Sequence, residues 1–81
     1  MKKETIKFYS IEPFFSKEKS GIKNNTVRFT DHGERFKALK KFDLKKEIFV
    51  EIINPNTFEC FTRQIKDVSI YENIFIITWR Q

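Results

Sequence analysis

The chain has 81 residues, a formal net charge of +5 at pH 7 and a single cysteine. This length suits one domain with one hydrophobic core, and the lone cysteine excludes both an internal disulfide and a thiolate metal cluster. Ten Phe, two Tyr and one Trp can fill that core, because each aromatic side chain buries roughly 150–250 Å². We therefore expect residues 1–81 to form a single domain in a reducing, cytoplasmic setting.

Positive charge is concentrated in the first half of the chain. Residues 1–46 hold 13 Lys or Arg and 6 Asp or Glu, whereas residues 47–81 hold 3 and 5. A basic surface attracts phosphate backbones or acidic proteins, although a charged face can also serve solubility alone. No segment approaches the roughly 20 apolar residues of a membrane span, and no apolar run of a signal peptide follows the first residues. We expect no membrane association and no export by an ordinary signal.

The first half of the chain contains the signals of two strands and a helix between them. Alternating residues predict a strand over residues 5–9. Pro13 suits a helix start, and Gly21 suits the helix end because glycine readily adopts a positive φ. A second strand is expected over residues 25–30.

The second half continues as a helix followed by strands. The helix is expected over residues 33–41, with Phe36 and Leu39 on its inner face. Four strand patterns follow, in residues 47–53, 57–64, 65–71 and 74–80. Six short strands with two short helices inserted early favour an α+β domain built on a small, mostly antiparallel β-barrel that is closed or nearly closed.

A glycine and three polar residues form the most informative motif: Gly21, Lys23, Thr26 and Arg28. In a strand Thr26 and Arg28 point to the same face, and Lys23 lies just before that strand. We therefore expect an amine, a hydroxyl and a guanidinium to converge on one small anionic or carbonyl-bearing ligand. The structural alternative is that the glycine permits a tight turn and that Arg28 pairs with an acid such as Glu51.

These four residues occupy the four fixed positions of GxKxx[ET]xR, the signature of the ASCH domain family within the PUA-like superfamily. The chain also resembles this family in the order of its elements, over most of its length. The resemblance implies a small β-barrel with a cleft beside the signature, used to bind RNA or a modified nucleoside. The chain departs from the family at residues 42–47, where relatives usually have a Gly-Asp pair before the next strand.

Some small relatives with Thr in the third signature position are amidohydrolases that remove the acetyl group from acetylated cytidine. By resemblance, Lys23 and Thr26 would then be the catalytic groups, completed by a later glutamate. Three candidates for that glutamate remain open, namely Glu51, Glu59 and Glu72. Chemically, a hydroxyl can attack an amide carbon if a neighbouring lysine accepts the hydroxyl proton. The lysine must be neutral to do so, which requires that water is excluded from the site. A glutamate can then act as general acid or base for the leaving amine.

Residues around the motif extend this hypothesis. Five lysines are expected to supply a positive field for nucleic acid: Lys17, Lys19, Lys37, Lys40 and Lys41. Phe14 and Phe15 are adjacent and therefore lie on different faces, so that one of them can be exposed and stack on a base. His32 is the only histidine, and we expect neither a metal site nor a cofactor. Cys60 alternates with Phe58, which predicts a buried, unreactive thiol.

A different class of function is also compatible with the sequence. In composition the chain resembles small phage or prophage accessory proteins, which bind and modulate a host protein. In that case the signature residues would serve only the fold. The sequence thus leads to three expectations: binding of RNA or a modified nucleoside, binding of a host protein, and hydrolysis of acetylated cytidine.

Overall fold

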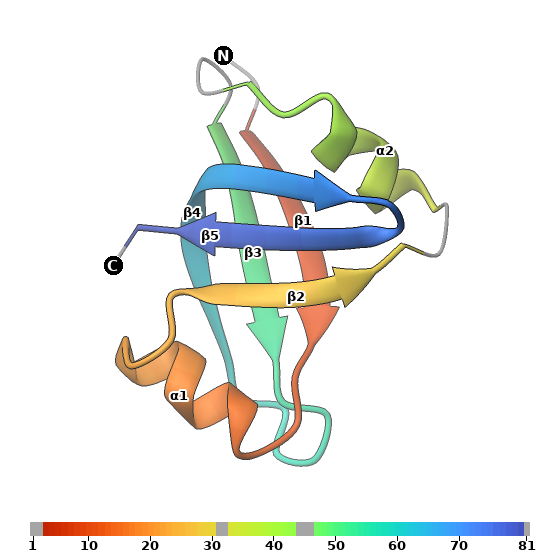
Figure 1. Ribbon diagram of the computed structural model, residues 1–81. Coiled ribbons are helices and arrows are strands. Elements are labelled where there is room, and N and C mark those ends of the chain that lie inside the picture. The colour runs from red at the N-terminus through yellow and green to blue at the C-terminus, as the bar shows by residue number, and fades with distance from the viewer. Residues whose placement is uncertain (1–2, 31–32, 44–46, 81) are drawn as a thin grey trace.

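The computed structural model describes residues 3–30, 33–43 and 47–80, which form an α+β arrangement of strands and helices (Figure 1). In chain order the elements are β1 (Lys3–Tyr9), α1 (Phe14–Ser20), β2 (Asn25–Phe29), α2 (Glu34–Lys40), β3 (Glu47–Ile53), β4 (Cys60–Tyr71) and β5 (Ile74–Trp79). None of the helices in these residues is long and apolar enough to cross a membrane. His32, for which no metal role is expected, lies outside the described residues.

The five strands form one mixed sheet in the order β1-β3-β4-β5-β2. β1 and β3 run parallel, and the other neighbours are antiparallel. The long β4 belongs to both halves, since its beginning pairs with β3 and its end pairs with β5. The pairing shifts between Ile65 and Asp67, and such an irregularity lets a strand bend. Figure 1 shows the result: β5 and β2 cross in front of β1 and β3.

The described residues form five strands where the sequence predicts six, because residues 57–64 and 65–71 contribute to one strand. Their junction at Gln64 and Ile65 contains no turn-forming residue, and the chain continues through a register shift instead of reversing. β4 begins only at Cys60, since Phe58 has a positive φ of 62° and leaves the extended conformation.

That later start also corrects the prediction for Cys60. Phe61 faces the core and is 7% exposed, so its neighbour Cys60 points outward and its thiol is exposed. Phe58, on the turn before the strand, is exposed as well. The prediction of a buried thiol is therefore wrong, because Phe58 belongs to the turn and the strand that starts at Cys60 turns Phe61 toward the core.

The sheet is open along the seam between its edge strands, β1 and β2. Within the described residues no backbone pairing joins these two strands, so closure into a barrel is not established. Two guanidinium groups cover the free edge of β1 instead. Arg28 donates to the Tyr9 carbonyl at 2.7 Å, and Arg35 donates to the Lys7 carbonyl at 2.9 Å. Side chains thus satisfy edge carbonyls that a backbone ladder would satisfy in a closed barrel.

Aromatic residues between the two halves of the sheet form the core. The ring of Phe36 packs edge to face on Phe8 and Phe75, with centroids 5.8 and 5.0 Å apart. Phe61 packs in the same way on Trp79, which is fully buried.

Each helix buries one side, as the sequence predicts. α2 buries Phe36 and Leu39. α1 buries Phe15 and leaves Phe14 half exposed, which confirms that the two adjacent rings lie on different faces. α1 ends at Gly21, whose φ of 91° confirms the need for glycine at this position.

Candidate ligand-binding site

A pocket of about 430 Å³ opens at the seam, where the end of β1 and the start of α1 face β2. This volume lies within the range of small-molecule sites in proteins. Its walls are formed by Tyr9, Ser10, Ile11, Phe14, Glu18, Lys23, Thr26, Val27 and Arg28. Three of the four signature residues therefore line a single pocket, and the fourth, Gly21, shapes the turn that leads to it.

Local backbone structure explains how the signature residues reach the pocket. The positive φ of Gly21 turns the chain sharply after α1. The Lys23 amide then donates to the Lys17 carbonyl at 2.9 Å, which fixes the loop back onto the helix. Thr26 and Arg28 follow at alternate positions of β2 and share its inner face, as the strand spacing predicts.

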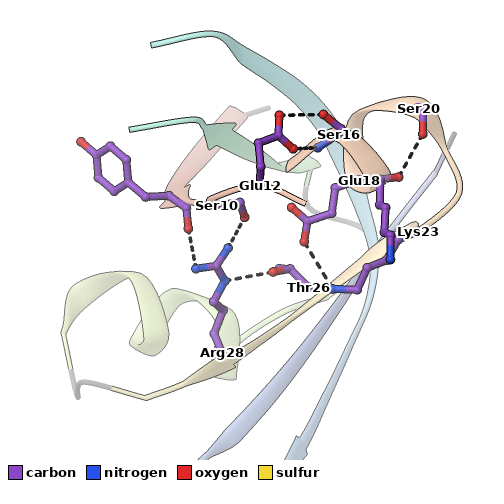
Figure 2. Close-up of polar contacts among 10 residues, drawn as sticks. Ser10, Glu12, Ser16, Glu18, Ser20, Lys23, Thr26 and Arg28 are labelled. Carbon is purple, nitrogen blue, oxygen red and sulfur yellow. Dashed lines mark hydrogen bonds and ion pairs between the residues drawn. The ribbon is translucent and has the colours of Figure 1, made fainter. Parts of the chain in front are cut away.

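Arg28 organises the polar wall of the pocket (Figure 2). Its Nε donates to Thr26 Oγ1 at 2.9 Å, and its Nη2 donates to Ser10 Oγ at 2.6 Å, in addition to the Nη1 bond to the Tyr9 carbonyl. Both hydroxyl groups accept from Arg28 and so keep their own protons for another partner. Arg28 therefore positions the two hydroxyl groups and does not pair with Glu51, the acid considered from the sequence.

The charge of Arg28 is held close to other charged and aromatic groups. Burial lowers the pKa of the Arg28 guanidinium below its ordinary value, the nearby Glu18 carboxylate acts in the opposite direction, and Arg35 adds to the lowering. The guanidinium carbon also lies 5.0 Å from the centroid of the Phe8 ring, within the range of a cation–π contact. The Phe8 ring thus adds a cation–π contact to the three hydrogen bonds that orient Arg28.

Glu18 supplies the carboxylate of the pocket, which the sequence hypothesis sought elsewhere. The residue is only 1% exposed, and its Oε2 lies 3.4 Å from Lys23 Nζ. Its other oxygen, Oε1, is buried and accepts no hydrogen bond from the described residues. Lys23 Nζ also lies 5.7 Å from the centroid of the Phe14 ring. An amine, a carboxylate and a half-exposed aromatic ring thus meet beside Thr26.

The three glutamates expected as catalytic partners lie outside the pocket. Glu51 on β3 approaches Lys7 on β1 at 3.9 Å. Glu59 forms an exposed ion pair with Lys19. Glu72 is exposed in the turn between β4 and β5 and has a positive φ of 53°.

The five lysines expected to surround the site are divided between two regions. Lys17 and Lys19 lie on α1, whereas Lys37 and Lys40 lie on α2 and Lys41 follows it. Figure 1 shows the two helices on opposite sides of the molecule. None of the five lines the ligand pocket. A separate hollow of about 370 Å³ is lined by Glu4, Glu34, Lys37, Ala38, Lys41 and Ile48.

Among the pocket residues that the sequence does not identify, Glu18 and Ser10 supply polar side chains to the hydrogen-bonded wall. A signal for Glu18 was present, because it follows the buried Phe15 by three positions and so shares its helical face. Ser10 follows the last residue of β1 and has no comparable signal. No protein-family model matches this chain, and no curated protein matches it.

Proposed function

We propose that this chain is a cytoplasmic binding module of the ASCH, PUA-like type that holds a nucleobase, either in a modified nucleoside or in RNA. The observation that carries the proposal is the convergence of Lys23, Thr26 and Arg28 in one pocket. The open seam would be the cleft of a PUA-like barrel, with Arg28 and Arg35 covering the edge of β1.

The chemistry of the walls supports a flat heterocycle as the ligand. Phe14 is 50% exposed and offers a ring face for stacking, beside the amine of Lys23. Ile11 adds apolar surface around the opening. The Thr26 hydroxyl supplies a hydrogen-bond donor to the edge of the ring. A pocket with mostly apolar walls and a few fixed polar groups is typical of sites for small ligands.

Calorimetric titration of the protein with nucleosides and a short single-stranded RNA tests this proposal. The variants Thr26→Val and Lys23→Met each remove one polar group from the pocket, and we expect affinity to fall about tenfold or more. Lys66→Met is the matched control, because Lys66 is exposed on β4 and outside the pocket. Equal affinity of all four proteins for every ligand would refute the proposal.

A second candidate, binding of a host protein, is supported by exposed apolar residues on the outer face of β2, β5 and the end of β4. The exposed fractions are 50% for Val27, 69% for Phe29, 38% for Ile76 and 69% for Tyr71. Val27 is the direct cross-strand neighbour of Ile76. Adjacent exposed apolar residues often mark protein interaction sites. Copurification of one stoichiometric partner that is lost in Phe29→Ser but kept in Thr26→Val would favour this candidate.

Hydrolysis of acetylated cytidine is a further alternative, since Thr26, Lys23 and a glutamate line the same pocket. Within the described residues, however, Lys23 contacts Glu18 and makes no hydrogen bond to the Thr26 hydroxyl. A nucleophile needs a base within hydrogen-bonding reach, so binding is the better supported function. Release of acetate from N4-acetylcytidine that stops in a folded Thr26→Ala variant would establish the hydrolase.

A further inference from the structure

We infer that Glu18 selects the ligand by accepting an N–H group from it, so that the pocket takes a heterocycle bearing an amino group and rejects rings that lack one. This inference rests on the proposed function and names the chemical class of its ligand. It differs from the expectation of an anionic or carbonyl-bearing ligand, because the least exposed polar residue of the pocket, Glu18, offers an acceptor.

The hydrogen bonding of the Glu18 carboxylate is incomplete. Its contact with Lys23 is 3.4 Å long, whereas a good charge-assisted hydrogen bond measures roughly 2.7–2.9 Å. Oε1 is buried and has no donor among the described residues. A buried carboxylate oxygen without a donor is unfavourable, and a ligand N–H can relieve this. Figure 2 shows the carboxylate directed from α1 toward Lys23 and Thr26 on the opposite wall.

A hydrogen-bond donor lies in the same pocket as this free acceptor, on the opposite wall. Thr26 is buried and its oxygen accepts from Arg28, so its hydroxyl proton is available to a ligand. The complementary ligand edge therefore has an N–H group next to an acceptor atom. The edges of adenine and cytosine offer this arrangement, with an exocyclic amine beside a ring nitrogen.

Two pairs of nucleosides that differ by one amino group test this inference. Adenosine is compared with purine riboside, and cytidine with pyrimidin-2-one riboside, by calorimetric titration. We expect the amino-bearing member of at least one pair to bind about tenfold or more tightly, because a site built to hydrogen-bond a group rejects the analogue without it. A ratio within about twofold in both pairs would overturn the inference.

Variants then assign the preference to Glu18. In Glu18→Met, which cannot accept the bond, the affinity ratio should fall to about one. Glu59→Gln is the control, since it removes the same charge outside the pocket and should keep the ratio. Circular dichroism and thermal melting establish that each variant folds. If the methionine variant does not fold, Glu18→Gln replaces it, and the ratio should still fall because the neutral amide accepts more weakly.

The possible failures are distinguishable. Suppose that nucleosides bind and that Thr26→Val weakens their binding. If the affinity ratio between amino-bearing and amino-free nucleosides is near one, or is unchanged in the Glu18 variant, the inference fails and the proposed function stands. If no nucleoside and no RNA binds, both fail together.

Discussion

Arg28 shows how one side chain can hold an open seam together. It connects β2 with the Tyr9 carbonyl at the end of β1 and with the Ser10 hydroxyl, and it orients Thr26 on its own strand. The planar guanidinium reaches all three oxygens at once, which a single ammonium group cannot do with the same geometry. The residue thus stabilises the fold and positions the polar wall of the pocket.

The first prediction concerns the stability that Arg28 provides. Arg28→Met should lower the free energy of unfolding by about 2 kcal/mol, because three acceptors lose their donor. Arg28→Lys should recover less than half of this loss. Urea denaturation gives both values. Arg80→Met serves as the control, since Arg80 is exposed and its substitution should change stability by no more than about 0.5 kcal/mol. Equal effects at the two arginines would contradict the role assigned to Arg28.

Single residues also show how far the candidate site was predictable. The motif spacing placed Lys23, Thr26 and Arg28 together, because strand alternation is a local rule. The carboxylate was sought among glutamates later in the chain, whereas the structure brings in Glu18 from the preceding helix. Which acid approaches the motif depends on how α1 packs against β2, and this is a tertiary contact that no local pattern determines.

At the scale of elements, the end of α1 depends on its glycine. Gly21 has a φ of 91°, a conformation that costs a residue with a Cβ roughly 1–2 kcal/mol of conformational free energy. Gly33, before α2, has a φ of −80°, which carries no such cost. Gly21→Ser should therefore destabilise the protein by about 1–2 kcal/mol. The same change at Gly33 should be neutral or slightly stabilising, because serine is a favourable N-cap. Thermal unfolding of the two variants measures these changes in stability. Similar losses of stability at both positions would refute this account.

The beginning of α1 is held by a side chain. The Ser16 amide donates to Glu12 Oε1 at 3.0 Å, and the Ser16 hydroxyl donates to Glu12 Oε2 at 2.7 Å. α1 has seven residues, too few to be stable without such support. Glu12→Ala should therefore speed amide hydrogen exchange in α1 severalfold and weaken nucleoside binding, since α1 carries Phe14 and Glu18. The amides of α2 are the internal control, and equal acceleration in both helices would contradict a local role.

The elements themselves were largely predictable, and the main error lay in counting strands. Periodicity identified α2 and the strands β1, β2, β3 and β5 to within one or two residues, and the Pro13 and Gly21 signals identified α1. β4 was divided because strands of about 5–6 residues are usual, whereas this one has 12. Its length is a tertiary requirement, since one strand must pair with β3 in one half of the sheet and with β5 in the other.

At the scale of the whole molecule, the net charge of +5 should raise the affinity for RNA but not for a free nucleoside. A nucleoside carries no phosphate, so its affinity should change little between about 50 and 200 mM salt. RNA affinity should fall, with a slope in log–log form of about −0.7 for each phosphate neutralised on a single strand. Equal salt dependence of the two ligands would mean that the RNA backbone does not contact the basic surface.

The positions of the lysines make this prediction specific. Lys17 lies on α1, the helix that carries Phe14 and Glu18 into the pocket, whereas Lys40 lies on α2 on the opposite side of the molecule. If the base enters the pocket, the neighbouring phosphates pass closer to α1. Lys17→Gln should therefore reduce the magnitude of the salt slope by about 0.7, and Lys40→Gln, an equal change in charge, should leave it unchanged. An equal reduction in both variants would instead indicate that RNA wraps around the molecule and that all the lysines act as one field.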